Sequence, residues 1–127
     1  MNNARDALYA LTLKRYRHFV YTHRGLSSNV LIDHFNMRHV FEEVVTSQNE
    51  FPRKPAPDAL NYLISKYYLD RENTYYVGDR ILDMESANNA WIKEILYLKP
   101  NGVGETTDLA TYVVSDLIEI PNLSVFK

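Results

Sequence analysis

The alternation of apolar and polar positions predicts that strands and helices take turns along this chain. Short runs rich in Val, Tyr, Ile and Thr, bounded by polar or turn residues, are typical of buried strands. Such runs lie at residues 18–22, 43–47, 74–77, 94–98 and 112–114. Helical patterns lie at residues 5–16, from Ser27-Ser28 through Phe35, after Pro57, and from about residue 82 to 90. The sequence therefore predicts an α/β protein.

The helix after Pro57 has the clearest pattern. Its apolar residues follow the i, i+3, i+4, i+7 spacing of one helix face, at Leu60, Leu63, Ile64 and Tyr67. Strands joined through helices of this length need crossover connections, so the sheet is expected to be parallel with helices on both faces. The predicted architecture is a doubly wound, Rossmann-like three-layer fold, in which ligands collect at the carboxyl ends of the strands.

Composition and charge narrow the class of protein. The chain has 127 residues, enough for one globular domain, and 14 Lys and Arg against 16 Asp and Glu give a net charge of −2. That balance does not support a nucleic-acid surface. The absence of cysteine excludes disulfides and thiolate metal sites, and no apolar run is long enough to span a membrane. We expect a cytoplasmic protein, with the pairs Tyr67-Tyr68 and Tyr75-Tyr76 in core or half-buried strand positions.

The strongest candidate for chemistry is the segment from Val77 to Asp83. Gly78 permits a tight turn at the end of a strand, Asp79 follows it, and Asp83 comes four residues later on the next helix. Two converging carboxylates suit Mg²⁺, which prefers one or two carboxylates with water and phosphate oxygens. The alternative is that Asp79 caps the helix and Asp83 is an ordinary solvated residue.

Two further candidates also follow or precede predicted elements. Lys54 stands before a proline and is therefore expected to be extended and fixed, which suits an ammonium group that neutralises a phosphoryl group. Thr22 ends a strand, and its hydroxyl with the next backbone N–H groups would make a small anion cradle. The alternatives are a surface lysine in a turn and a β-prone residue that closes its strand.

Taken together and in this order, these segments resemble the haloacid dehalogenase superfamily, especially its phosphoglycolate phosphatase and β-phosphoglucomutase branch. Thr22 matches the family's second motif. Lys54, in the string Lys-Pro-x-Pro-Asp, matches the third, and Gly78-Asp79-x-x-x-Asp83 matches the fourth. The resemblance extends from about Phe19 to Leu117.

The resemblance implies roles for five residues. Lys54 and Thr22 would be catalytic, with Thr22, His23 and Lys54 binding the transferring phosphoryl group. Asp79 would hold Mg²⁺, and Asp83 would support the metal directly or through water. The reaction implied is transfer of a phosphoryl group from a small phosphorylated metabolite to an enzyme aspartate, followed by hydrolysis.

The chain departs from the family in its first motif. No Asp-x-Asp-Gly-Thr string occurs in the 127 residues, so the nucleophile, the first central strand and most of the cap are expected to be absent from this chain. We therefore expect a single, N-terminally incomplete core domain, inactive alone and able to self-associate through its incomplete sheet. The alternative is a non-catalytic module of the same fold that works through a partner protein. The sequence does not identify the substrate, and it does not distinguish a phosphatase from a phosphomutase.

Overall fold

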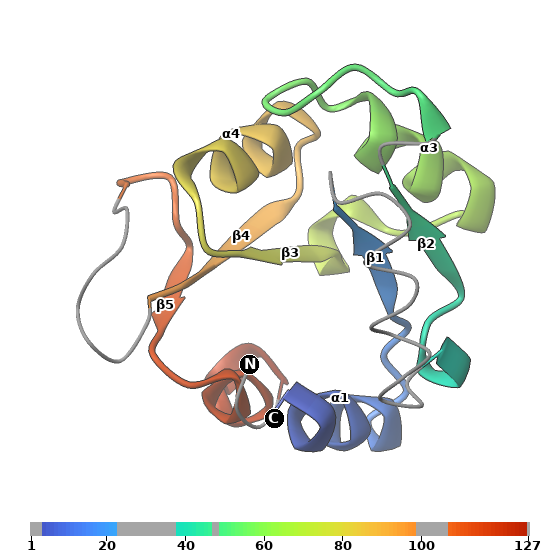
Figure 1. The fold of residues 1–127 in the computed structure, drawn as a ribbon. Coiled ribbons are helices and arrows are strands. Elements are labelled where there is room, and N and C mark those ends of the chain that lie inside the picture. Colours follow the sequence, from blue (N-terminus) through green and yellow to red (C-terminus); the bar gives the residue numbers. More distant parts are fainter. Residues whose placement is uncertain (1–3, 23–37, 47–48, 99–106, 127) are drawn as a thin grey trace. The chain divides into compact units, whose positions relative to one another are not determined.

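The computed structural model describes residues 4–22, 38–46, 49–98 and 107–126 (Figure 1). These residues divide between two compact units, one from residues 1–51 and 118–127 and the other from residues 52–117. Each unit contains its own parallel sheet, with strand order β1-β2 in the first and β3-β4-β5 in the second. The predicted α/β class with parallel strands is confirmed.

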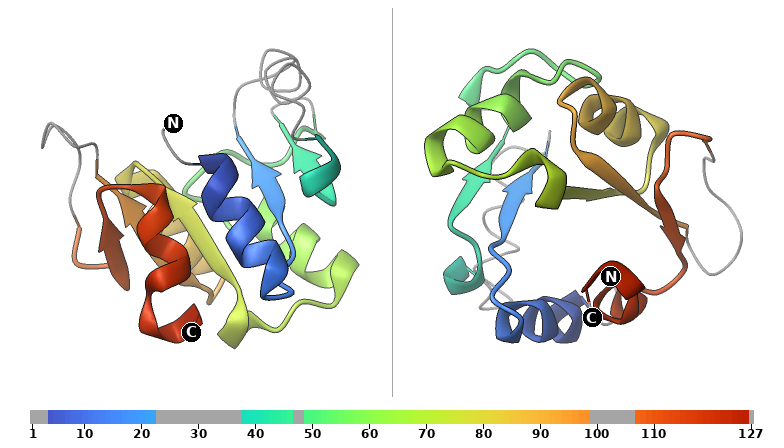
Figure 2. Two further views of the ribbon diagram at one scale, coloured as in Figure 1. Left: turned by 90° about the horizontal axis from the view of Figure 1, so that it is seen from below. Right: turned by 180° about the vertical axis from the view of Figure 1, so that it is seen from behind.

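The first unit joins a two-stranded sheet to helical segments from both ends of the chain. Its described elements are α1 (Ala4–Leu13), β1 (Phe19–Tyr21), η1 (Arg38–Val40), β2 (Glu43–Val45) and η5 (Ser124–Phe126), together with most of η4 (Leu117–Asn122). The ammonium of Lys14 donates to the carbonyls of Pro121 (2.7 Å) and Phe126 (2.9 Å). This lysine therefore fixes the C-terminal segment beside the end of α1 (Figures 1 and 2).

The second unit has β4 at the centre of three parallel strands, as Figure 2 shows from two sides. Its elements are α3 (Asp58–Tyr67), η3 (Arg71–Asn73), β3 (Tyr75–Gly78), α4 (Ile81–Asn89), β4 (Lys93–Tyr97) and β5 (Tyr112–Val114). Ile95 and Leu96 of β4 are buried, and so are Met84 and Ala87 of α4, which packs against β3 and β4. The Arg71 guanidinium donates to Asn61 on α3 and to the carbonyl of Ala90 after α4.

The helices α1, α3 and α4 end in the same way, each followed by a non-glycine residue in the left-handed region. The residues are Arg15 (φ 69°), Tyr68 (φ 54°) and Trp91 (φ 61°). In each case the next N–H donates to a carbonyl five residues earlier, the Schellman arrangement: Tyr16 to Leu11, Leu69 to Ile64, and Ile92 to Ala87. Glycine is usual at this position because a side chain there costs about 1–2 kcal/mol.

The predicted elements agree with the observed ones to within a few residues at their ends. The apolar stripe after Pro57 is α3, with Leu60, Leu63 and Ile64 buried. The prediction for Tyr68 was wrong: it lies past the end of α3 with 94% of its surface exposed, because the left-handed backbone there turns it away from the helix's apolar face. The helix predicted from Ser27 to Phe35 lies outside the described residues.

Candidate functional site

The turn after β3 is built around the carboxylate of Asp83. This side chain reaches back from α4, and its Oδ2 accepts hydrogen bonds from the backbone N–H groups of Asp79 and Arg80 (both 3.2 Å). It therefore satisfies N–H groups at the start of α4, as an acidic residue in the first turn commonly does. A Cβ on Gly78 would clash with the side chain of Asp83. Glycine is required at position 78 by this close approach.

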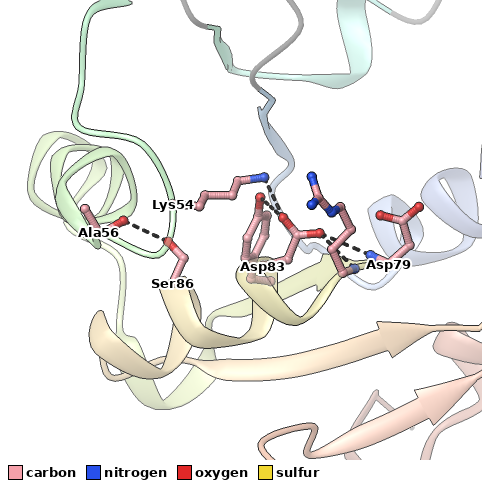
Figure 3. A network of polar contacts seen from close by, with 7 residues as sticks. Lys54, Ala56, Asp79, Asp83 and Ser86 are labelled. Carbon is pink, nitrogen blue, oxygen red and sulfur yellow. Dashed lines mark hydrogen bonds and ion pairs between the residues drawn. The ribbon is translucent and has the colours of Figure 1, made fainter. Parts of the chain in front are cut away.

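The other oxygen of Asp83 holds Lys54. The Lys54 Nζ lies 2.5 Å from Asp83 Oδ1, and the two side chains are only 11% and 8% exposed (Figure 3). Tyr76 on β3 contacts the same pair, with its ring centroid 5.3 Å from the ammonium and its hydroxyl 3.4 Å from Asp83 Oδ1. An ammonium between a carboxylate and a ring face has little freedom, since both contacts favour the same position, and the Tyr76 hydroxyl donates to the same carboxylate.

The loop that carries Lys54 is fastened to the same helix. The Ser86 hydroxyl donates to the carbonyl of Ala56 (2.9 Å), as Figure 3 shows, and the Asn89 amide donates to the carbonyl of Pro55 (2.9 Å). A turn bond from Ala56 N–H to the Arg53 carbonyl (3.0 Å) closes the loop on itself. Helix α4 thus contacts both the side chain of Lys54 and the backbone that follows it.

Asp79 stands differently from Asp83, although both are carboxylates of one motif. Asp79 is exposed, and in Figure 3 its carboxylate lies apart from that of Asp83. The alternative interpretation of this segment was wrong on both points, because Asp83 is buried and the N-cap position of α4 is occupied by Arg80 and not by Asp79. The two aspartates therefore differ in what they can bind.

The structure brings the side chains of Lys54 and Asp83 together near the carboxyl end of β3, and Asp79 stands in the same turn with its carboxylate apart from theirs. Thr22 belongs to the first unit and follows β1, where its backbone N–H donates to the carbonyl of Val45 (2.9 Å). His23 lies outside the described residues. Across the described part of the chain, no three His, Asp or Glu side chains gather where they could share a metal ion. None of its helices could cross a membrane.

Sequence reasoning missed three side chains of this network: Tyr76, Ser86 and Asn89. The signal for two of them was present, because Asp83, Ser86 and Asn89 recur every three residues and so follow one side of α4. Nothing local marked Tyr76, which reads as one more half-buried strand tyrosine.

The sequence model of the haloacid dehalogenase-like hydrolases matches residues 1–97, about three quarters of the chain. The chain belongs to this family. It is 35% identical to the core domain of a provisionally assigned phosphoglycolate phosphatase from Streptococcus pneumoniae TIGR4, with a TM-score of 0.82, covering 100% of this chain and 88% of that one. The resemblance found in the three motifs is thereby confirmed.

Two other solved structures share the fold of this chain but are much longer than it. A hydrolase from the same S. pneumoniae strain is 29% identical with a TM-score of 0.74, covering 80% of this chain and 53% of that one. A HAD phosphatase from Thermococcus onnurineus has a TM-score of 0.87 at 17% identity, over 97% of this chain and 57% of that one. This chain thus spans little more than half of either relative. No curated protein matches it.

Proposed function

We propose that residues 1–127 form one core domain of a Mg²⁺-dependent phosphatase that acts on small phosphorylated metabolites in the cytoplasm. The observation that carries this proposal is the ammonium of Lys54, held on Asp83 at the carboxyl end of β3, where Asp79 also stands. Parallel α/β sheets bind their ligands at this end of the strands. Membership of a hydrolase family with phosphatases among its matched structures supports the same reaction class.

Lys54 would bind the transferring phosphoryl group. A buried, immobilised ammonium stabilises the charge on phosphoryl oxygens more effectively than a solvated one, because little reorganisation is needed when the substrate arrives. Thr22, through its hydroxyl, and His23, through its backbone N–H, would bind the remaining oxygens. These two assignments rest on the family motif alone.

The carboxylates that follow β3 could provide one ligand for Mg²⁺. Both oxygens of Asp83 already accept hydrogen bonds from Lys54 and from two backbone N–H groups. Asp79 is exposed, and Mg²⁺ sites commonly use one or two carboxylates with water and phosphate oxygens. Asp79 would therefore be the ligand and Asp83 an indirect support. When bound, Mg²⁺ would neutralise negative charge on the phosphoryl oxygens.

The isolated 127-residue chain would turn over little or no substrate. The family's nucleophile belongs to an Asp-x-Asp motif, and no two aspartates of this sequence are two residues apart. Without that carboxylate there is no group to receive the phosphoryl group and form the aspartyl phosphate. Self-association through the sheet also stays a prediction.

The proposal is tested by titrating the chain with inorganic phosphate, with and without Mg²⁺, by calorimetry. We expect Lys54→Met to weaken phosphate binding at least tenfold, since a hydrogen bond to a charged group contributes about 1.5–3 kcal/mol. Lys66→Met, which removes an exposed ammonium from α3, is the matched control and should change little. Lys54→Arg keeps a charge opposite Asp83 and serves if Lys54→Met fails to fold.

The metal assignment has its own control. Asp79→Asn should abolish the enhancement of phosphate binding by Mg²⁺, and Asp108→Asn, at another exposed aspartate of the same unit, should leave it intact. Equal losses in Lys54→Met and Lys66→Met would overturn the role of Lys54. Asp79-dependent turnover of a phosphomonoester by the isolated chain would overturn the proposal that this chain lacks the nucleophile and is inactive alone.

A further inference from the structure

Three side chains on α4 contact the loop of Lys54 from one direction. Asp83 binds the ammonium, Ser86 binds the carbonyl of Ala56, and Asn89 binds the carbonyl of Pro55. Their spacing of three residues sets them slightly less than one helical turn apart along one side of α4. The loop therefore packs against one side of the helix, with one contact to each of these three residues.

Ser86 and Asn89 contribute differently to this contact. Ser86 is completely buried, so its hydroxyl and the Ala56 carbonyl would each lose a needed partner if the bond were broken. Asn89 is exposed, and its amide donates to the loop at the surface. An exposed helix residue usually extends its side chain into the solvent, but the side chain of Asn89 instead makes a hydrogen bond to the loop.

We propose that Ser86 and Asn89 are positioning residues for Lys54, which set where its ammonium stands by fixing the two carbonyls that follow it. The contacts with Asp83 and Tyr76 act only at the tip of a side chain with four rotatable bonds and large rotamer entropy, so the position of its base has to be fixed separately. Fixing the backbone on the same helix that bears Asp83 makes the base and the tip of the side chain move together. The consequence for phosphate binding rests on the function proposed above.

The donor character of residue 89 provides the sharpest test. Asn89→Asp has nearly the same shape but cannot donate to the Pro55 carbonyl, and Asn89→Gln keeps the donor on a longer arm. Asn88→Asp is the matched control, since Asn88 is the neighbouring exposed residue and its substitution adds the same negative charge. Ser86→Ala removes the buried donor, with Ser65→Ala on the exposed side of α3 as its control.

The primary readout is the ¹⁵N signal of the Lys54 ammonium in lysine-labelled chain, assigned with Lys54→Arg. We expect Asn89→Asp and Ser86→Ala to shorten the lifetime of its protons against exchange with water, and Asn89→Gln to restore it. A loss of stability alone would lower the urea midpoint without changing this signal in the folded protein. An unchanged ammonium signal in both variants would overturn the inference.

Phosphate affinity is the second readout. Both variants should weaken binding of inorganic phosphate by about three- to tenfold, the equivalent of one lost hydrogen bond, with no change in the two controls. If the wild-type chain binds no phosphate, the proposed function fails and the ammonium signal still decides the positioning role. If phosphate binds normally to Asn89→Asp and Ser86→Ala, the positioning role fails and the proposed function stands.

Discussion

An ion pair of the first unit and one of the second have similar lengths in very different surroundings. In the second unit Lys54 and Asp83 are 2.5 Å apart with 11% and 8% of their side chains exposed. In the first, Arg17 and Glu42 are 2.6 Å apart with 45% and 37% exposed. Arg17 and Glu42 also make a second contact, at 2.8 Å, so this pair has the two-bond, forked geometry that the Lys54–Asp83 pair lacks. Burial, and not the distance between atoms, determines what each pair contributes.

The two pairs are therefore expected to have different purposes. A solvated pair contributes about 0–1 kcal/mol, because water and salt weaken the attraction and two long side chains lose freedom. A buried pair gains little net stability over an apolar replacement, yet removing one partner leaves an uncompensated charge. The buried pair thus fixes the place of a charge, which is what the role proposed for Lys54 requires.

The largest effect is expected from breaking the buried pair. Asp83→Ala should lower the free energy of unfolding by about 3–5 kcal/mol, since it strands the Lys54 ammonium and frees two backbone N–H groups. Urea unfolding followed by circular dichroism measures the loss. Asp108→Ala, at an exposed aspartate of the same unit, is the control. A loss no larger than the control's would mean that burial does not distinguish the two pairs.

An intermediate effect of opposite sign is expected at the helix ends, where both units should respond alike. Arg15→Gly in the first unit and Trp91→Gly in the second should each raise stability by about 1 kcal/mol, because glycine accepts a positive φ without strain. Both residues are exposed, Trp91 at 84%, so little buried surface is lost.

Alanine at the same positions separates backbone strain from the side chain. Trp91→Ala keeps a Cβ and therefore keeps most of the strain, so only glycine should stabilise. Equal gains from alanine and glycine would show that the indole itself, and not the left-handed backbone, is unfavourable there. Thermal unfolding is sufficient for this comparison.

The smallest effect is expected at the solvated pair. The hydrogen bond from Arg17 holds the pKa of Glu42 below its ordinary value. A lowered carboxyl pKa stabilises the fold above the unfolded value of about 4.3, and this stability is lost as the pH falls through the folded pKa. Glu42→Gln should cost less than about 1 kcal/mol at pH 7 and flatten the acid limb of stability against pH. A steeper acid limb in this variant would contradict that origin.

Sequence patterns predicted the strands well because buried strands are short runs of β-branched and aromatic residues bounded by turn or polar residues. The runs at 43–47 and 112–114 contain adjacent valines between turn or polar residues, and β2 and β5 form there. The same logic placed Asp79 directly after β3 and Asp83 on the following helix, because the Gly-Asp turn is local in sequence. Class and strand positions therefore follow from local chemistry.

The partners within the site could not be predicted in the same way. Lys54 and Asp83 are 29 residues apart, and only the packing of α4 beside the loop makes them meet. The last turns of α1, α3 and α4 were also difficult, since Arg15, Tyr68 and Trp91 occupy positions that glycine normally signals. The ion pair thus depends on a tertiary contact that no short window of sequence contains, and the helix ends lack the residue that usually marks them.

The missing side chain of Gly78 has a consequence for ligand design. Because Asp83 fills the space beside Gly78, the backbone N–H groups of Asp79 and Arg80 donate to a carboxylate of their own chain. The partial positive charge at the start of α4 is thus largely neutralised from within. A compound designed to bring an anion to this helix end would compete with Asp83 for donors already in use.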